Sequence, residues 1–144
     1  MEFTIDIAAP IEQVFALLSD LQSYSRWLPP SGLFNATTEV SDSPVRLGTT
    51  YRDGARAPLY GRVTAYSPPE SLAFHQENRM PLGRLAIDIQ YRLEAIPGGT
   101  RVYRTTSPRF YGPASFLQGL IIPSIRKENL RTLEMMKKHL EQAS

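Results

Sequence analysis

The stretch IDIAAPIEQVFALLSDLQSYSRWLPP, residues 5–30, takes the chain from a strand into two helices and ends at a rigid double proline. Its first residues end the run MEFTIDIA, residues 1–8, in which Phe3, Ile5 and Ile7 alternate with polar residues, as expected of a half-buried strand. Pro10 suits the first position of a helix, because its missing N–H costs nothing there. Apolar residues then recur at spacings of three and four, which predicts a helix with one buried face. They are Ile11, Val14, Phe15, Leu18 and Leu21.

A second short helix is predicted over YSRWL, residues 24–28, with Ser23 as its cap. Pro29 and Pro30 prevent its continuation, so Trp27 should lie in its last turn. Two interpretations of this single tryptophan stay open: it covers the mouth of a cavity, or it anchors the core.

The middle of the chain, residues 33–107, consists of short runs separated by turn signals, the pattern of consecutive antiparallel strands. Pro97-Gly98-Gly99 is the clearest of these turns. Together with the first strand, the runs predict a sheet of seven strands. The six runs are LFNATTEV (33–40), TTYRD (49–53), LYGRVTAY (59–66), SLAFHQEN (71–78), LAIDIQYRLEA (85–95) and TRVYRTTS (100–107).

The last block of the sequence is predicted to be helical from near Pro113 almost to the end. Pro123 should bend or break its first third. The predicted fold class is therefore α+β: one domain over residues 1–144, in which a curved antiparallel sheet of seven strands grips a long C-terminal helix. The stripe of this helix that should face the sheet consists of Ile122, Ile125, Leu133, Met136 and Leu140.

Composition excludes several classes of protein. The net charge of +2 comes mostly from arginines scattered along the chain. Nucleic-acid binding needs cations that converge on one face, so we expect no nucleic-acid partner. The sequence has no cysteine, which removes disulfides, zinc–thiolate sites and thiol nucleophiles and suits a cytoplasmic location. No signal-peptide pattern and no apolar run of about 18 residues is present, so we expect no stable membrane insertion.

The order of strand, two short helices, six strands and long helix resembles the helix-grip architecture of the START-like superfamily. AAPIEQVFALLSDLQSYSRWLP, GRVTAYSPPESLAFH and GGTRVYRT are similar to the corresponding parts of its polyketide cyclase/dehydrase branch. The resemblance covers essentially the whole chain. It implies an apolar cavity between sheet and long helix, with the short helices at its mouth. Members bind lipids, sterols, hormones or polyketides, and some are enzymes, so the resemblance does not choose between binder and catalyst.

Polar side chains on the inward face are the most informative, because each needs a partner, a water or a ligand. Gln76 shares a strand face with Leu72 and Phe74, and Tyr91 shares one with Ile87 and Ile89. Arg104 faces inward if Val102 does, and could then bind a carboxylate or enolate oxygen of a ligand. An ion pair with an internal acid, or a strand register shifted by one residue, explains Arg104 equally well. The ligand-binding residues we predict are Trp27, Tyr51, Phe74, Gln76, Ile89, Tyr91, Arg104, Phe116 and Leu120.

The remaining chemistry is sparse. His75 and Glu77 share a strand face, but they oppose Leu72 and Phe74 and should point to water. His139 lies near the end of the last helix, where a cation is favoured. No set of three metal ligands, no nucleophile elbow and no phosphate loop can be assembled, so we expect neither a metal nor another cofactor. FLQGLIIP, residues 116–123, fits a cavity wall, a membrane-surface patch or a homodimer patch.

The function predicted is binding of a small hydrophobic or amphipathic ligand (a lipid, polyketide or aromatic metabolite) in an internal cavity, as carrier or sensor. The alternative is an enzyme of the polyketide cyclase/dehydrase type that acts on a carbonyl substrate in the same cavity, using hydrogen bonds to a developing oxyanion. A chaperone-like module ranks last, because it would need a large exposed apolar patch.

Overall fold

The computed structural model describes residues 1–31, 34, 36–54, 59–80 and 83–142. Its single sheet has the order β1-β7-β6-β5-β4-β3-β2, and every neighbouring pair is antiparallel. The α+β fold class is thereby confirmed, with seven strands in the sheet. The strands are β1 (Glu2–Ile7), β2 (Thr37–Thr38), β3 (Thr50–Asp53), β4 (Leu59–Ser67), β5 (Ser71–Met80), β6 (Gly83–Ile96) and β7 (Gly99–Tyr111).

The strands β6 and β7 form the longest hairpin and carry six of the residues that line the pocket described below. Pro97 and Gly98 make the turn, and Gly98 adopts a positive φ of 83°, which glycine tolerates without strain. Gly99 is required for a different reason. A Cβ there would lie 2.0 Å from the carbonyl oxygen of Ile7, because β1 turns into the first helix directly above it.

Two short helices follow β1, as expected: α1 (Ile11–Ser19) and the 3₁₀ helix η1 (Leu21–Arg26). The second begins three residues earlier than predicted, because the buried Leu21 belongs to it, and Trp27 lies just past its end. The strand predicted over residues 33–40 is only Thr37–Thr38. Its Leu33 and Asn35 lie outside the described residues, and the left-handed φ of 53° at Glu39 ends β2.

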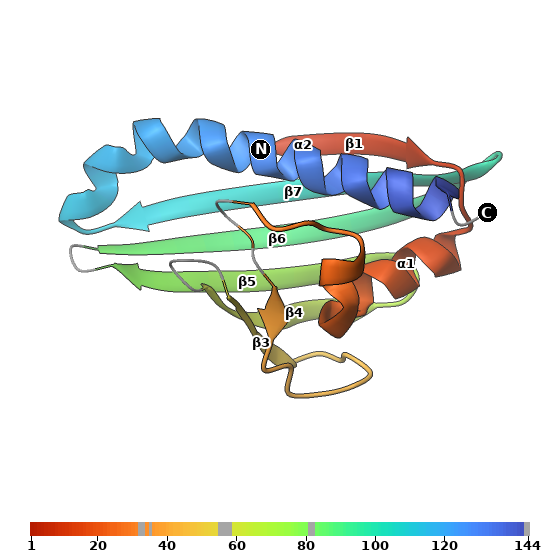
Figure 1. The fold of residues 1–144 in the computed structure, drawn as a ribbon, viewed down its shortest axis with the longest axis horizontal. Coiled ribbons are helices and arrows are strands. Elements are labelled where there is room, and N and C mark those ends of the chain that lie inside the picture. The colour runs from red at the N-terminus through yellow and green to blue at the C-terminus, as the bar shows by residue number, and fades with distance from the viewer. Residues whose placement is uncertain (32–33, 35, 55–58, 81–82, 143–144) are drawn as a thin grey trace.

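The chain ends in η2 (Pro113–Leu117) and α2 (Gln118–Gln142), and α2 continues through Pro123 without a break. Figure 1 shows α2 running along the sheet beside β1 and β7, with α1 beneath its last turns. The buried stripe of α2 changes character along its length. Towards the C-terminus it is apolar and packs on the core, whereas one turn earlier it carries Asn129 and Thr132. The apolar part consists of Leu133, Met136 and Leu140.

Candidate functional site

A pocket of about 190 Å³ lies between the inner face of the sheet and the first half of α2. Its described lining comes from η1, the segment between η1 and β2, the strands β2 to β7, and α2, and it is mostly apolar. For scale, an engineered apolar cavity of about 150 Å³ accommodates benzene. A pocket of this size therefore fits a molecule with one or two rings, or a short chain.

An aromatic row forms one wall of the pocket. Phe74 stands between Tyr51 and Tyr91, with ring centroids 5.8 Å and 6.4 Å away and both ring pairs edge to face. The hydroxyl of Tyr51 accepts a hydrogen bond of 2.6 Å from Gln76 Nε2. The ring of Tyr51 lies over Gly61 of β4, where a Cβ would come within 2.2 Å of its Cζ. Only a glycine at position 61 leaves Tyr51 where it is.

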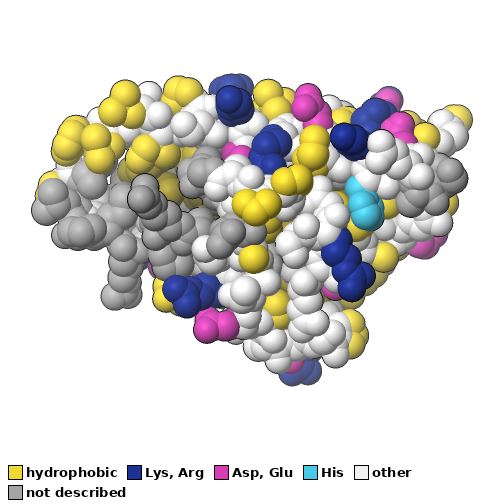
Figure 2. Space-filling model, in the orientation of Figure 1, with side chains coloured by type: hydrophobic (Ala, Val, Ile, Leu, Met, Phe, Trp, Pro, Cys, Tyr) yellow, Lys and Arg dark blue, Asp and Glu magenta, His cyan; other side chains and the backbone are white. Residues whose placement is uncertain are grey.

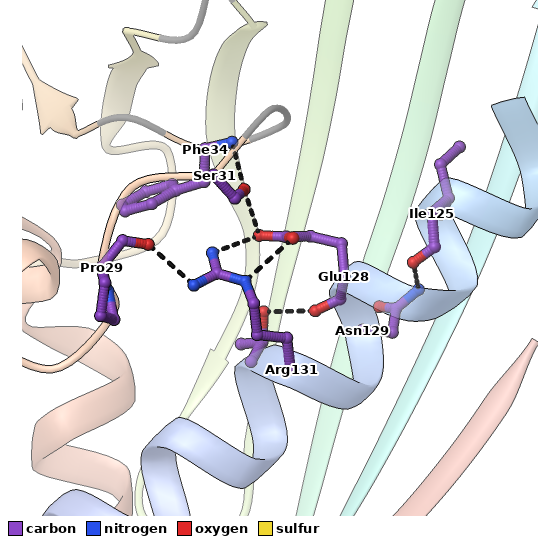
Figure 3. Close-up of polar contacts among 8 residues, drawn as sticks. Pro29, Ser31, Phe34, Ile125, Glu128, Asn129 and Arg131 are labelled. Atoms are coloured by element: carbon purple, nitrogen blue, oxygen red, sulfur yellow. Dashed lines mark hydrogen bonds and ion pairs between the residues drawn. The ribbon is translucent and has the colours of Figure 1, made fainter.

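Arg104 projects from β7 into the pocket, and its side chain is held on two sides. Nε donates a hydrogen bond of 2.6 Å to Asn129 Oδ1 from α2, and Nη1 donates to the hydroxyl of Tyr91. Its guanidinium carbon lies 5.1 Å from the centroid of the Tyr91 ring. Asn129 is itself oriented, because its Nδ2 donates to the carbonyl of Ile125 at 2.9 Å (Figure 3). The register pairs Arg104 with Tyr91 across the β6–β7 hairpin.

The two tyrosines of this wall are neutral at ordinary pH. Burial raises the pKa of Tyr91, although Arg104 opposes the change. Burial likewise raises the pKa of Tyr51, while its hydrogen bond from Gln76 opposes the rise. Both hydroxyls therefore act as hydrogen-bonding groups and not as anions.

Two polar side chains that the sequence analysis did not single out, Thr106 and Asn78, also line the pocket. Thr106 Oγ1 and Asn78 Oδ1 are buried, and neither has a hydrogen-bond partner among the described residues. The signal was present: Thr106 is two residues beyond Arg104, and Asn78 is two beyond Gln76, so each shares its neighbour's face. Unpartnered buried polar atoms are uncommon in folded proteins, and such atoms in a pocket are available to a ligand.

Polar contacts tie the segment after η1 to α2 at the edge of the pocket, as Figure 3 shows. Arg131 holds Glu128 through Nη2–Oε1 at 2.6 Å and donates from Nη1 to the carbonyl of Pro29 at 2.8 Å. Ser31 Oγ donates to Glu128 Oε1 at 3.1 Å and accepts from the backbone N–H of Phe34. Phe34 and Glu128 both line the pocket. The network thus fixes one side of the pocket to the helix.

Six of the predicted ligand-binding residues line the pocket, and three lie elsewhere. Trp27 is 4% exposed and packs against Tyr24, with ring centroids 4.9 Å apart, as a core anchor. Phe116 and Leu120 are 75% and 76% exposed. Figure 2 shows hydrophobic side chains gathered over η2 and the first turns of α2, where these two residues lie. The six residues in the lining are Tyr51, Phe74, Gln76, Ile89, Tyr91 and Arg104.

His75 lies on the outer face of the sheet, away from the pocket. Its Nδ1 is 2.6 Å from Asp88 Oδ1, and its Nε2 is 2.9 Å from Glu77 Oε1. The hydrogen bond to Glu77, followed by that to Asp88, raises the pKa of His75. Within the described part of the chain, no group of three or more His, Cys, Asp or Glu side chains is arranged to hold a metal ion. No helix there is long and apolar enough to cross a membrane.

The curved antiparallel sheet and the long C-terminal helix that lies along it define a helix-grip protein. The chain matches the model of the family described as polyketide cyclase / dehydrase and lipid transport over residues 1–141, and it therefore belongs to that family.

Similar proteins are known, all at low sequence identity. An uncharacterised protein of Mycobacterium tuberculosis is 32% identical over 115 residues, which are 77% of this chain and 66% of that protein. The match thus spans just under two thirds of that relative's length. Among solved structures, one half of the di-domain ARO/CYC protein StfQ from the steffimycin biosynthetic pathway superposes with a TM-score of 0.75 and 9% identity, covering 99% of this chain and 50% of StfQ. Ara h 8.0201 superposes with a TM-score of 0.73 and 13% identity, covering 99% and 97%.

Proposed function

We propose that this protein binds a small amphipathic molecule in the pocket and acts as its carrier or sensor. The observation that carries the proposal is a pocket whose walls are mainly apolar and whose polar groups are held in place by other side chains. Burial of apolar ligand surface supplies affinity at about 25 cal/mol per Å² before ordering costs are subtracted. Fixed polar groups then set the orientation of the ligand.

Pre-organisation supports this proposal. Arg104, Tyr91 and Asn129 hold one another, so their rotamers need no rearrangement when a ligand arrives. Gln76 and Tyr51 hold each other in the same way further along the sheet. Such a site loses little conformational entropy on binding. The family description, which includes lipid transport, is in keeping with a carrier. A cytoplasmic location and a homodimer stay predictions.

Methyl NMR tests the proposal with 2-naphthamide, a neutral two-ring compound. Binding in the pocket will shift the methyl signals of Ile89 and Ile125, which line it, and leave that of Leu120, which is exposed, unchanged. Shifts confined to Leu120 would place the compound on the surface over the first turns of α2. That result would refute the proposed site.

A second function, catalysis of the cyclase/dehydrase type, is favoured by one contact. The Arg104 guanidinium and the Tyr91 hydroxyl meet inside the pocket, so two donors converge where a carbonyl oxygen of a substrate would gain negative charge. The similarity to StfQ, named as an ARO/CYC protein, is consistent with this alternative. Under it, turnover of a carbonyl substrate disappears in Arg104→Leu and Tyr91→Phe while both variants stay folded. Unchanged turnover in both variants rejects the assignment.

A further inference from the structure

Arg104 is a buried cation whose protein partners are all uncharged. The residue is 8% exposed, and its guanidinium bonds to the Asn129 amide oxygen and the Tyr91 hydroxyl. Its third nitrogen, Nη2, has no hydrogen-bond partner among the described residues, and none of their carboxylates forms an ion pair with it. Removing a charge from water without a counter-charge costs several kcal/mol. The arrangement is therefore incomplete as a purely structural device.

The two carboxylates in the described lining of the pocket do not supply that counter-charge. Glu128 is held by both Arg131 Nη2 and Arg131 Nε, at 2.6 Å and 3.1 Å, so its charge is already neutralised. Asp53 lies at the other end of the pocket: the strand registers place it level with Leu85 of β6, six residues from Tyr91. Six residues of a strand span about 20 Å.

A second observation points to an oxygen-rich ligand group next to Arg104. Thr106 follows Arg104 by two residues on the same face of β7, about 7 Å along the strand. Its hydroxyl is buried, has no partner among the described residues and lines the same pocket. A hydroxyl and a guanidinium nitrogen, neither with a partner among the described residues, are thus carried by one face of β7 into the same pocket. This pair suits an acceptor that carries negative charge.

We propose that the ligand is an aromatic carboxylate of one or two rings, whose carboxylate binds Arg104 and Thr106 and whose ring packs on the aromatic row. The inference rests on the proposed function, because it names the chemical class that the same pocket takes. The pocket volume of about 190 Å³ limits the body of the ligand, and Phe74 with its two tyrosine neighbours offers ring edges for it. The charge of Arg104 selects an anionic head over a neutral one.

The test compares 2-naphthoate with 2-naphthamide by isothermal titration calorimetry on the purified chain. The two compounds share a ring body and differ in the charge of the head. We expect the wild type to bind naphthoate at least about tenfold more tightly, because hydrogen bonds to charged groups contribute more than neutral ones. Arg104→Gln should abolish this preference. Arg92→Gln, which removes an exposed arginine from the neighbouring strand β6, should leave it intact.

The outcomes separate this inference from the proposed function. Equal affinity of the wild type for the two compounds overturns the carboxylate inference and leaves the pocket as a binding site. Absence of binding by both at millimolar concentration overturns the inference and counts against the proposed function as well. The wild-type comparison decides even if Arg104→Gln does not fold. Arg104→Lys, which keeps the charge, then serves as the second variant and should retain a preference for naphthoate.

Discussion

Gly61→Ala tests the packing that holds one wall of the pocket in place. The added Cβ would lie 2.2 Å from Tyr51 Cζ and 2.6 Å from both Cε1 and the hydroxyl oxygen, well inside van der Waals contact. Tyr51 is 5% exposed and its ring lies over Gly61, so the ring must shift and its 2.6 Å hydrogen bond from Gln76 is broken or distorted. Overpacking typically costs about 1–3 kcal/mol and a lost hydrogen bond about 1 kcal/mol.

We therefore expect Gly61→Ala to lower the free energy of unfolding by about 2–4 kcal/mol. For a chain of this size, that corresponds to a fall in Tm of very roughly 10 °C. Urea denaturation followed by the fluorescence of the buried Trp27 measures the change, because Trp27 is the single tryptophan. The pocket should also bind its ligand more weakly, since the ring of Tyr51 lines it.

Two controls show whether the ring of Tyr51 is the cause. Gly119→Ala adds the same methyl group in α2, where nothing lies within 4 Å, and should stabilise the chain by about 1 kcal/mol through helix propensity. In a Tyr51→Ala background, Gly61→Ala should cost almost nothing, because the clash is gone. An equal loss with and without the Tyr51 ring would refute the reasoning.

Two further predictions concern the two faces of the sheet. Tyr91→Ala, at an inward position of β6, should weaken binding of 2-naphthamide at least about tenfold, as measured by calorimetric titration. Arg92→Ala, on the outer face of the same strand, should leave binding unchanged. Equal effects of the two substitutions would show that the ligand does not bind on the inner face of the sheet. On the outer face, contacts with Glu77 and Asp88 raise the pKa of His75 above its unfolded value of about 6.5. The stability that protonated His75 contributes is therefore fully present below the unfolded pKa and is lost as the pH rises through the higher folded pKa. Urea midpoints measured across that range should fall with rising pH less steeply in His75→Gln than in the wild type, and identical profiles would count against this ion-pair cluster.

Much of the fold could be predicted because its elements agree with their local patterns. The alternation in residues 85–95 and 100–107, joined by Pro97-Gly98-Gly99, specifies a long hairpin, and the structure extends it to Gly83–Ile96 and Gly99–Tyr111. Prediction was weakest over residues 33–40. A run between turn signals predicted a full strand there, but β2 is only Thr37–Thr38 and the left-handed backbone at Glu39 ends it.

The site was partly predictable for the same reason. Period-two patterns place Gln76 and Tyr91 on the inner face of the sheet, and the structure puts both in the lining of the pocket. Asn129 could have been found, because it stands one helical turn after Ile125 and one before Leu133, both in the predicted apolar stripe. The contact between Asn129 and Arg104 could not be predicted from the sequence pattern, because it depends on how α2 crosses the sheet.

Phe116 and Leu120 show the limit of apolar character as a guide. Their apolar run fitted a cavity wall, a membrane-surface patch or a homodimer patch, and both side chains are exposed, one in η2 and one in the first turn of α2. The sheet-facing stripe of α2 is set by its buried residues, and Leu120 falls outside it. A role in ligand binding for these two residues stays a prediction.

The central claim is that the pocket holds a small molecule, and native mass spectrometry of the chain purified from its own host tests it most directly. Denaturing extraction then identifies whatever is released. The account predicts a near-stoichiometric small molecule on the wild type and its loss from Thr132→Phe, which fills the pocket from α2. A wild type that carries nothing, or a compound retained in full by Thr132→Phe, would contradict it.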